Sequence, residues 1–285
     1  YVTGPISAIL NIGYLLSGII PSTKRYYEFM ALEEEKENEE GMTEPCFGDL
    51  ELQNLSFSYE KDKAVLSDIN IAFPKGSKTV LIGRNGSGKS TLISLLLQLY
   101  QPTGGKITLN GIDISEFVLR EYRNMVSVVS QEIYLFNSSI RDNICMYKNI
   151  DDKFIMEACK DSGLADFISE VSLDYVVGQN GAMLSGGQKQ KIALARALVH
   201  NSPVIIFDEA TSNTDVYSEH QINGLLHTKL KEKTVIIITH KQEILKEADQ
   251  IIMLKDGAVV GSGVYDDLSK DNLEFKNMLK MGEKY

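Results

Sequence analysis

The stretch KTVLIGRNGSGKSTLISLLL, residues 78–97, decides the fold of this chain. An apolar strand-like run, 78–82, leads into a glycine-rich turn, 83–90, and a helix-like apolar run, 91–97, follows. The turn fits the pattern G-x-x-x-x-G-K-[ST] at every fixed position. Its glycines let several backbone N–H groups point inward at an anion, while Lys89 and the start of the helix add positive potential. This order predicts an α/β fold with a phosphate-binding loop.

Two strand-like runs further along the chain end in residues suited to phosphate chemistry. The continuous apolar run 204–207 is typical of a strand buried on both faces of a parallel sheet, and it leads into Asp208 and Glu209. The similar run 235–239 leads into His240. Because carboxyl ends of parallel strands meet at one edge of a sheet, we expect these three side chains beside the phosphate loop.

The sequence LSGGQ, residues 184–188, is typical of a helix start. Ser185 is a good N-cap, and the two glycines after it permit close approach of another group to the backbone. An exposed helix N-terminus attracts anions. We expect this one to bind an anion; a plain capped helix is the alternative.

Together these motifs resemble those of the nucleotide-binding domain of an ABC transporter, and the resemblance covers nearly all of the chain. Residues 83–90 resemble the Walker A loop, 204–208 the Walker B strand and 184–188 the ABC signature. Single residues match further motifs of the family: Glu209 the catalytic carboxylate, Gln131 the Q-loop glutamine, Asp215 the D-loop aspartate and His240 the switch histidine.

The resemblance implies ATP and Mg²⁺ as cofactors and assigns roles to residues. Catalytic roles fall to Lys89, Gln131, Glu209 and His240, with Glu209 polarising the attacking water. The metal ligands are Ser90, Gln131 and Asp208. The nucleotide contacts are Tyr59, Gly83, Arg84, Asn85, Gly86, Ser87, Gly88, Lys89, Ser90, Thr91, Gln131, Ser185, Gly187 and Gln188. Tyr59 would stack on adenine, and packing at a strand end is the alternative for this ring.

The implied fold class is α/β: a P-loop NTPase core with a β-rich antiparallel subdomain and an inserted helical subdomain, preceded by an N-terminal helical segment. Alternating residues at 50–59 and short strands at 65–72 and 105–109 predict the antiparallel part. A helical pattern between 131 and 181 predicts the insertion. At 151–160 we expect Phe154, Ile155 and Ala158 to share one helix face.

The N-terminal segment carries no charge from Tyr1 to Thr23 and is long enough to span a bilayer. Lys24 and Arg25 follow, as expected on the cytoplasmic side of a membrane. The alternative is an amphipathic helix packed on a partner in water. We therefore divide the chain into residues 1–28, the C-terminal end of a transmembrane domain, 29–44, an acidic linker, and 45–285, the ATPase domain. Because the chain begins at Tyr1 rather than Met, we expect a fragment of a longer polypeptide.

Composition limits the partners. The net charge is −10 and the sequence pI about 5.0, so the basic footprint of a nucleic-acid-binding protein is missing. Three widely spaced cysteines, Cys46, Cys145 and Cys159, are typical of reduced thiols in a cytosolic compartment.

The stretch LFNSSIRDNI, residues 135–144, resembles what exporters carry after the Q-loop. The resemblance thus implies an exporter-type half-transporter in the cell membrane, with the ATPase domain on the cytoplasmic side. Its partners would be its own transmembrane domain and a second nucleotide-binding domain, from an identical chain or a paralogue. The alternatives are a soluble ABC ATPase acting on DNA or ribosomes and the ATPase subunit of an importer; the uncharged start argues against both. Three departures from the family pattern are Gln179, Asn213-Thr214 and Lys191.

Overall fold

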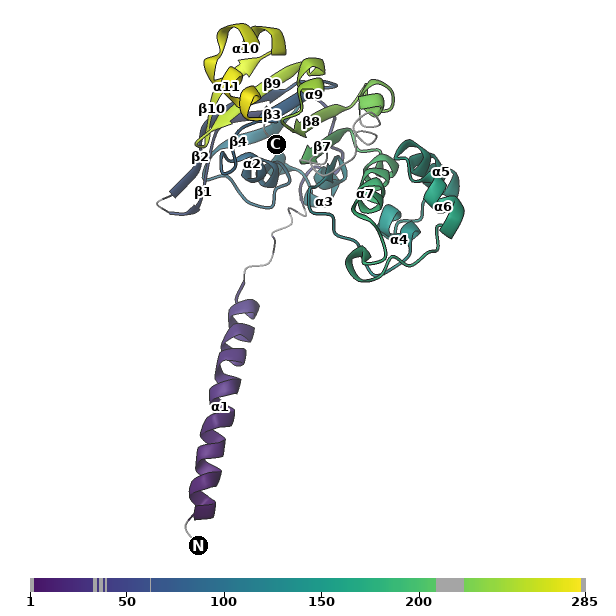
Figure 1. Cartoon of the computed structure of the whole chain (residues 1–285). Helices are drawn as coiled ribbons and strands as arrows, with labels where there is room; N and C mark the ends of the chain where they lie inside the picture. Colours follow the sequence, from purple (N-terminus) through teal and green to yellow (C-terminus); the bar gives the residue numbers. More distant parts are fainter. Residues whose placement is uncertain are drawn as a thin grey trace. The chain divides into compact units, whose positions relative to one another are not determined.

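The computed structural model describes residues 3–32, 35, 38, 40–61, 63–208 and 223–282, and the chain divides into two units, 1–37 and 38–285 (Figure 1). Several residues singled out from the sequence lie outside the described ones: Glu33, Glu34, Glu37 and Glu39 of the acidic linker, and Glu209, Asn213, Thr214 and Asp215.

The first unit contains one helix, α1 (Thr3–Met30), of 28 residues, which confirms the expected N-terminal helical segment. Pro21 lies inside it. Near this proline, the hydroxyls of Ser17 and Thr23 donate to the carbonyls of Tyr14 and Ile19, at 2.7 and 3.0 Å. Among the helices of the described residues, none is both long and apolar enough to cross a membrane. The assignment of residues 1–28 to a transmembrane domain stays a prediction.

A six-stranded sheet forms the centre of the second unit, in the order β10-β9-β3-β8-β7-β6. All neighbouring pairs from β9 to β6 are parallel, and β10 is antiparallel to β9. Successive residues of the central strands point into two different cores, which is why their sequences are continuously apolar. The strands are β3 (Lys78–Ile82), β6 (Val126–Val129), β7 (Val204–Asp208), β8 (Thr234–Ile238), β9 (Gln250–Lys255) and β10 (Ala258–Gly263).

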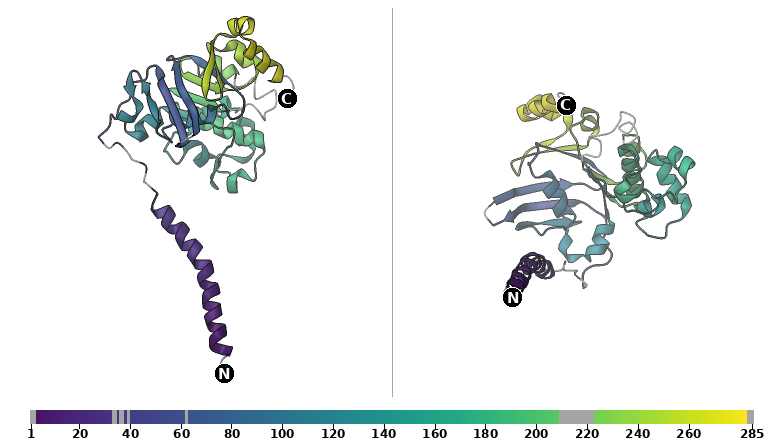
Figure 2. Two further views of the ribbon diagram at one scale, coloured as in Figure 1. Left: turned by 90° about the vertical axis from the view of Figure 1, so that its left-hand side faces the viewer. Right: turned by 60° about the horizontal axis from the view of Figure 1, so that its bottom comes forward.

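A second, antiparallel sheet has the order β2-β1-β4-β5. Its strands are β1 (Leu50–Glu60), β2 (Lys63–Phe73), β4 (Gly104–Leu109) and β5 (Ile112–Asp113), which confirms the β-rich subdomain. Its inward residues share one core with helix α2 (Lys89–Leu96) and one face of the main sheet. In the left view of Figure 2, β1 and β2 of this sheet are the blue strands.

The inserted helical subdomain is also confirmed. It contains α4 (Ile140–Cys145), α5 (Asp152–Asp161), α6 (Ala165–Val171) and α7 (Gly186–His200), which share a core of their own. Figures 1 and 2 show these helices at one side of the two sheets. The predicted apolar face of α5 was wrong in one residue: Ile155 and Ala158 are buried, whereas Phe154 is 59% exposed, because the buried stripe continues through Cys159 instead.

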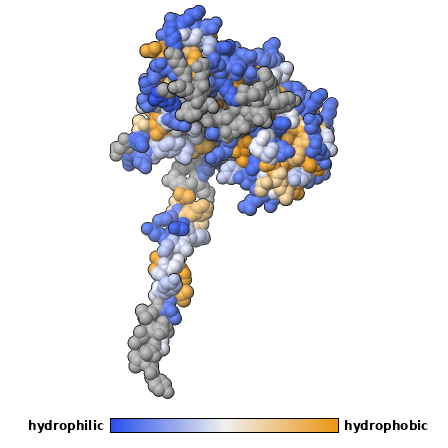
Figure 3. Space-filling model, viewed as in Figure 1, coloured by the Kyte–Doolittle hydropathy of each residue, from blue (hydrophilic) through white to orange (hydrophobic). Residues whose placement is uncertain are grey.

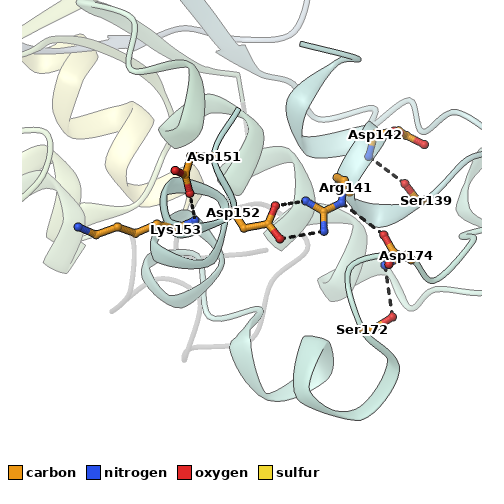
Figure 4. A network of polar contacts seen from close by, with 8 residues as sticks. All are labelled: Ser139, Arg141, Asp142, Asp151, Asp152, Lys153, Ser172 and Asp174. Atoms are coloured by element: carbon orange, nitrogen blue, oxygen red, sulfur yellow. Dashed lines mark hydrogen bonds and ion pairs between the residues drawn. The ribbon is translucent and has the colours of Figure 1, made fainter. Parts of the chain in front are cut away.

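A polar network holds α4, α5 and the loop after α6 together (Figure 4). Arg141 of α4 forms ion pairs with Asp152, at the start of α5, and with Asp174, at 3.3 Å. Helix starts are capped in the same region: Ser139 accepts from the N–H of Asp142, and Asp151 accepts from that of Lys153. The subdomain therefore has its own polar scaffold besides its core.

The remaining helices complete the main sheet. α3 (Leu119–Asn124) leads into β6, α9 (Gln242–Glu247) lies between β8 and β9, and α10 (Tyr265–Asp271) and α11 (Leu273–Gly282) follow β10. Phe275 of α11 is fully buried in the core on the second face of the sheet.

Candidate active site

The strand register brings the predicted motifs to one edge of the main sheet. Leu81 of β3 pairs with Ile238 of β8, and Ile238 pairs with Asp208 of β7. The phosphate loop therefore begins two residues beyond Leu81, and His240 lies two residues beyond Ile238. Gln131 follows β6, whose last residue Val129 pairs with Phe207. This is the edge expected for Asp208 and His240; Glu209, which was expected there too, lies outside the described residues.

The phosphate loop has a backbone that only glycines permit at two places. Gly88 has φ +103°, and a Cβ there would lie 2.5 Å from Cδ2 of Leu66. Gly83 has no room for a side chain either: its Cβ would lie 2.4 Å from the carbonyl oxygen of Leu254 and 2.5 Å from the Ser87 hydroxyl. The loop is thus pressed against β2 and β9, which fixes its shape before any ligand arrives.

Lys89 bends back over this loop. Its side chain is buried, and its ammonium donates to the carbonyl oxygens of Gly83 and Arg84, at 2.7 and 3.1 Å. Lys89 is also the first residue of α2, so the positive end of that helix points to the same place. A charge held in this way inside the loop attracts a phosphate group.

An open pocket of about 400 Å³ surrounds the loop. This size lies within the usual range for small-molecule sites, roughly 300–1,000 Å³. Its lining confirms that Gln131 lies together with the loop and the start of α2, since the pocket is formed by Val65, Asn85, Gly86, Gly88, Lys89, Ser90, Thr91 and Gln131. The sequence did not point to Val65, because nothing in a strand pattern tells which residue faces a ligand.

Three loop residues expected to contact the nucleotide do not line this pocket. Gly83 and Ser87 are buried beneath the loop, and Arg84 is exposed on its outer side. The Ser87 hydroxyl is buried without a hydrogen-bond partner in the described part of the chain. A buried hydroxyl of this kind is costly unless a ligand satisfies it.

Tyr59 lies beside the pocket, at the end of β1. Its hydroxyl is 3.2 Å from the Thr91 hydroxyl on α2, and its ring is 53% exposed. Both alternatives for this residue therefore find support, because the ring packs at the strand end and also offers a face next to the phosphate loop.

Asp208 and His240 occupy the ends of neighbouring strands. Asp208 is partly buried, and His240 is exposed in the turn between β8 and α9. The next residue, Lys241, donates its backbone N–H to the Thr239 hydroxyl at 3.3 Å, and burial lowers the pKa of its ammonium. The described residues thus provide an acid and an imidazole at the edge where the phosphate loop opens.

The signature forms the start of α7, as predicted, with a reciprocal cap. Ser185 accepts from the N–H of Gln188 at 3.2 Å, and the Gln188 side chain accepts from the N–H of Ser185 at 2.8 Å. Gly186 and Gly187 have open space around them: a Cβ at either would meet nothing within 4 Å. Of the described residues that line the phosphate-loop pocket, none comes from this helix.

Comparison with known proteins agrees with this geometry. The sequence profile of the family described as ABC transporter matches residues 66–212, from β2 through the end of the Walker B strand. The chain belongs to the ABC transporter family. It carries the family's ATPase domain.

Two kinds of relative match nearly the whole of this chain. ATP-dependent lipid A-core flippases of Escherichia coli K12 and Shigella flexneri are 35% identical over 282 residues, which is 97% of this chain and 48% of theirs. A solved structure of a bacterial Atm1-family ABC exporter with ATP bound superposes with a TM-score of 0.85 at 29% identity, covering 93% of this chain and 47% of that one. The chain thus spans about half the length of the relatives it matches.

Proposed function

We propose that this ABC ATPase domain binds Mg-ATP at the phosphate-loop pocket and uses its hydrolysis to drive export of a substrate across the cell membrane, with the domain on the cytoplasmic side. The observation that carries the proposal is the convergence of a glycine-shaped loop, a buried Lys89 and Gln131 around one pocket at the carboxyl edge of the sheet.

The residues present fit ATP and Mg²⁺. The loop offers a helix N-terminus and the ammonium of Lys89, which lines the pocket, for phosphate oxygens. Mg²⁺ usually keeps several waters and binds through one or two carboxylates together with substrate phosphates. Ser90 and Gln131 line the pocket and Asp208 ends β7, so these three would hold the ion. A bound Mg²⁺ neutralises charge on the β- and γ-phosphates.

The proposed roles at the reacting end come from the family resemblance, and the positions of Asp208 and His240 at the ends of neighbouring strands support them. Glu209, the residue after Asp208, would accept a proton from the attacking water as general base. His240, at the end of the neighbouring strand, would contact the γ-phosphate and hold Glu209 in place. Lys89 would bind phosphate oxygens and so lower the cost of charge that develops on them.

The signature supports a second ATPase domain as partner. Glycine at 186 and 187 is not required by packing within the chain, because a side chain there would meet nothing within 4 Å. Open backbone at a capped helix N-terminus fits a phosphate brought by another molecule. We therefore propose that the signature of one chain covers the ATP held by its partner, an identical chain or a paralogue.

The other proposed partner is the transmembrane domain of the same polypeptide. Figure 3 shows apolar residues gathered on the visible face of the helical subdomain. Exposed aromatic side chains there include Tyr134, Phe136 and Tyr147, and the rings of Phe136 and Tyr147 lie edge to face at 6.0 Å. Exposed apolar patches mark interaction sites. A membrane domain docked on this surface would contact the helical subdomain directly.

The test is the variant Glu209→Gln. We expect Mg-ATP affinity near that of the wild type and turnover lower by roughly 10²-fold or more, the usual range for a general base. Affinity is measured by calorimetry and turnover by phosphate release, with Lys89→Ala as a control that weakens binding itself. Hydrolysis at the wild-type rate in Glu209→Gln would assign the base to another residue.

A further inference from the structure

Tyr59 belongs to a cluster of three aromatic rings beside the phosphate loop. The ring of Phe57 lies 4.8 Å from that of Tyr59, at 87° between planes. The ring of Tyr100 lies 5.2 Å from Tyr59, at 90°. Phe57 and Tyr100 also touch, at 5.6 Å and 52°. Edge-to-face contacts of this kind are favourable because the positive edge of one ring meets the negative face of the other.

These contacts fix the Tyr59 ring at both ends. Its hydroxyl lies 3.2 Å from the Thr91 hydroxyl, on the helix that follows the phosphate loop. Two rings stand nearly perpendicular to its plane, so rotating Tyr59 would lose both aromatic contacts. The ring is nevertheless 53% exposed, so a free surface remains for a flat ligand.

The two neighbours of Tyr59 differ in what else they do. Phe57 is 4% exposed and belongs to the core beneath the antiparallel sheet. Tyr100 is 47% exposed and lies outside that core, in the segment between α2 and β4. A half-exposed ring contributes little to core packing, and of the two ring contacts of Tyr100 the shorter, edge-on one is with Tyr59.

We propose that Tyr100 is a positioning residue for the nucleotide base: it holds the Tyr59 ring in the orientation that stacks on adenine. This inference rests on the proposed function, since it needs ATP in the neighbouring pocket and adenine on Tyr59. Tyr100 itself acts through Tyr59 and contacts neither phosphate nor metal. It therefore raises the affinity for ligands that carry a base and does not change the affinity for phosphates without one.

Calorimetry with two ligands tests this. We expect Tyr100→Ala to weaken ATP binding roughly 2- to 10-fold, the equivalent of one aromatic pair, and to leave inorganic tripolyphosphate binding unchanged. Tyr100→Phe keeps the ring and should bind ATP as the wild type does. Leu99→Ala is the matched control, because Leu99 is the adjacent residue and is similarly exposed, at 54%. In a Tyr59→Ala background, Tyr100→Ala should add no further loss.

The mobility of the ring gives a second readout. The chain contains no tryptophan, so Tyr59→Trp introduces a lone indole at the site. Its fluorescence anisotropy should fall when Tyr100→Ala is added and stay constant when Leu99→Ala is added. A residue that only stabilised the fold would not change the motion of this one side chain below the unfolding transition.

The outcomes separate the two proposals. If Tyr59→Ala weakens ATP binding and Tyr100→Ala does not, the positioning role is wrong and the stacking role of Tyr59 stands. Equal losses for ATP and tripolyphosphate in Tyr100→Ala would likewise overturn the positioning role, in favour of a general effect on the loop. If Tyr59→Ala leaves ATP binding intact, stacking itself fails, and the role of Tyr100 fails with it.

Discussion

At the scale of single residues, the phosphate loop depends on two glycines with different surroundings. Gly88 combines φ +103° with a Leu66 side chain 2.5 Å from where a Cβ would stand, and Leu66 is fully buried. Gly86 has φ +80° and open space. The left-handed conformation costs a residue with a Cβ about 1–2 kcal/mol, and overpacking a core adds about 1–3 kcal/mol.

We therefore expect Gly88→Ala to lower the free energy of unfolding by about 2–5 kcal/mol and Gly86→Ala by about 1–2 kcal/mol. Urea unfolding without nucleotide measures both, so that ligand binding does not enter the comparison. Equal losses in the two variants would mean that the contact with Leu66 relaxes freely and only backbone strain counts.

At the scale of elements, the start of α7 has two separable tasks. As a helix cap, Ser185 accepts a hydrogen bond from the N–H of Gln188. In the proposed anion site, it must also tolerate a phosphate group beside it. Aspartate caps as well as serine does but repels a phosphate, whereas alanine removes the cap at a cost of about 0.5–2 kcal/mol. The Ser185→Asp variant should thus be more stable than Ser185→Ala. Its ATPase activity should nevertheless be lower than that of Ser185→Ala, by more than about 10-fold. Thermal unfolding ranks the variants by stability, and phosphate release ranks them by ATPase activity. The same ranking in both measurements would mean that Ser185 acts only as a helix cap.

The Arg141 network is a second element-scale device, and its effect depends on pH. Arg141 lowers the pKa of Asp152 below its ordinary 3.8 by hydrogen bonding and charge. A lowered pKa in the folded state adds stability above the unfolded-state value, and this gain disappears as the pH falls through the folded-state value. The stability difference between wild type and Arg141→Gln should therefore be small but constant near pH 7 and shrink below about pH 4. Arg120→Gln is the control, because Arg120 is exposed and pairs only weakly with Glu121, at 3.6 Å; a pH-independent difference for Arg141 would contradict the ion-pair account.

The elements themselves were largely predictable, whereas contacts between them were not. Two-residue alternation predicted β1, and continuous apolar runs predicted β7 and β8, because each pattern reports burial of its own strand. The prediction put Phe154 on the buried face of α5, but it is exposed. The helical periodicity alone does not show which edge of an apolar stripe meets the core. The contacts of Tyr59 with Thr91 and Tyr100 span 32 and 41 residues of sequence, and no local pattern encodes such distant pairs.

At the scale of the whole molecule, the phosphate loop leads into α2 and the signature begins α7, and the two do not share a pocket among the described residues. If the partner's signature completes each site, a single chain is a poor enzyme. Turnover should then rise faster than linearly with protein concentration until the dimer is saturated. Glu209→Gln with ATP should sediment as a dimer, because bound ATP is not consumed.

Mixing two damaged chains tests the shared site most directly. Lys89→Ala damages the phosphate loop, and Ser185→Arg damages the signature. Their mixed dimer has one site with both defects and one with neither, since each intact site takes its loop from one chain and its signature from the other. ATPase activity above that of either variant alone is therefore expected in the mixture, approaching about one quarter of the wild type if chains pair at random and sites act independently. The control is a mixture of Lys89→Ala with Glu209→Gln, whose defects fall on the loop side of the two sites and leave neither site intact. Turnover strictly proportional to wild-type concentration, together with a monomeric Glu209→Gln at saturating ATP, would show that the chain completes its site alone.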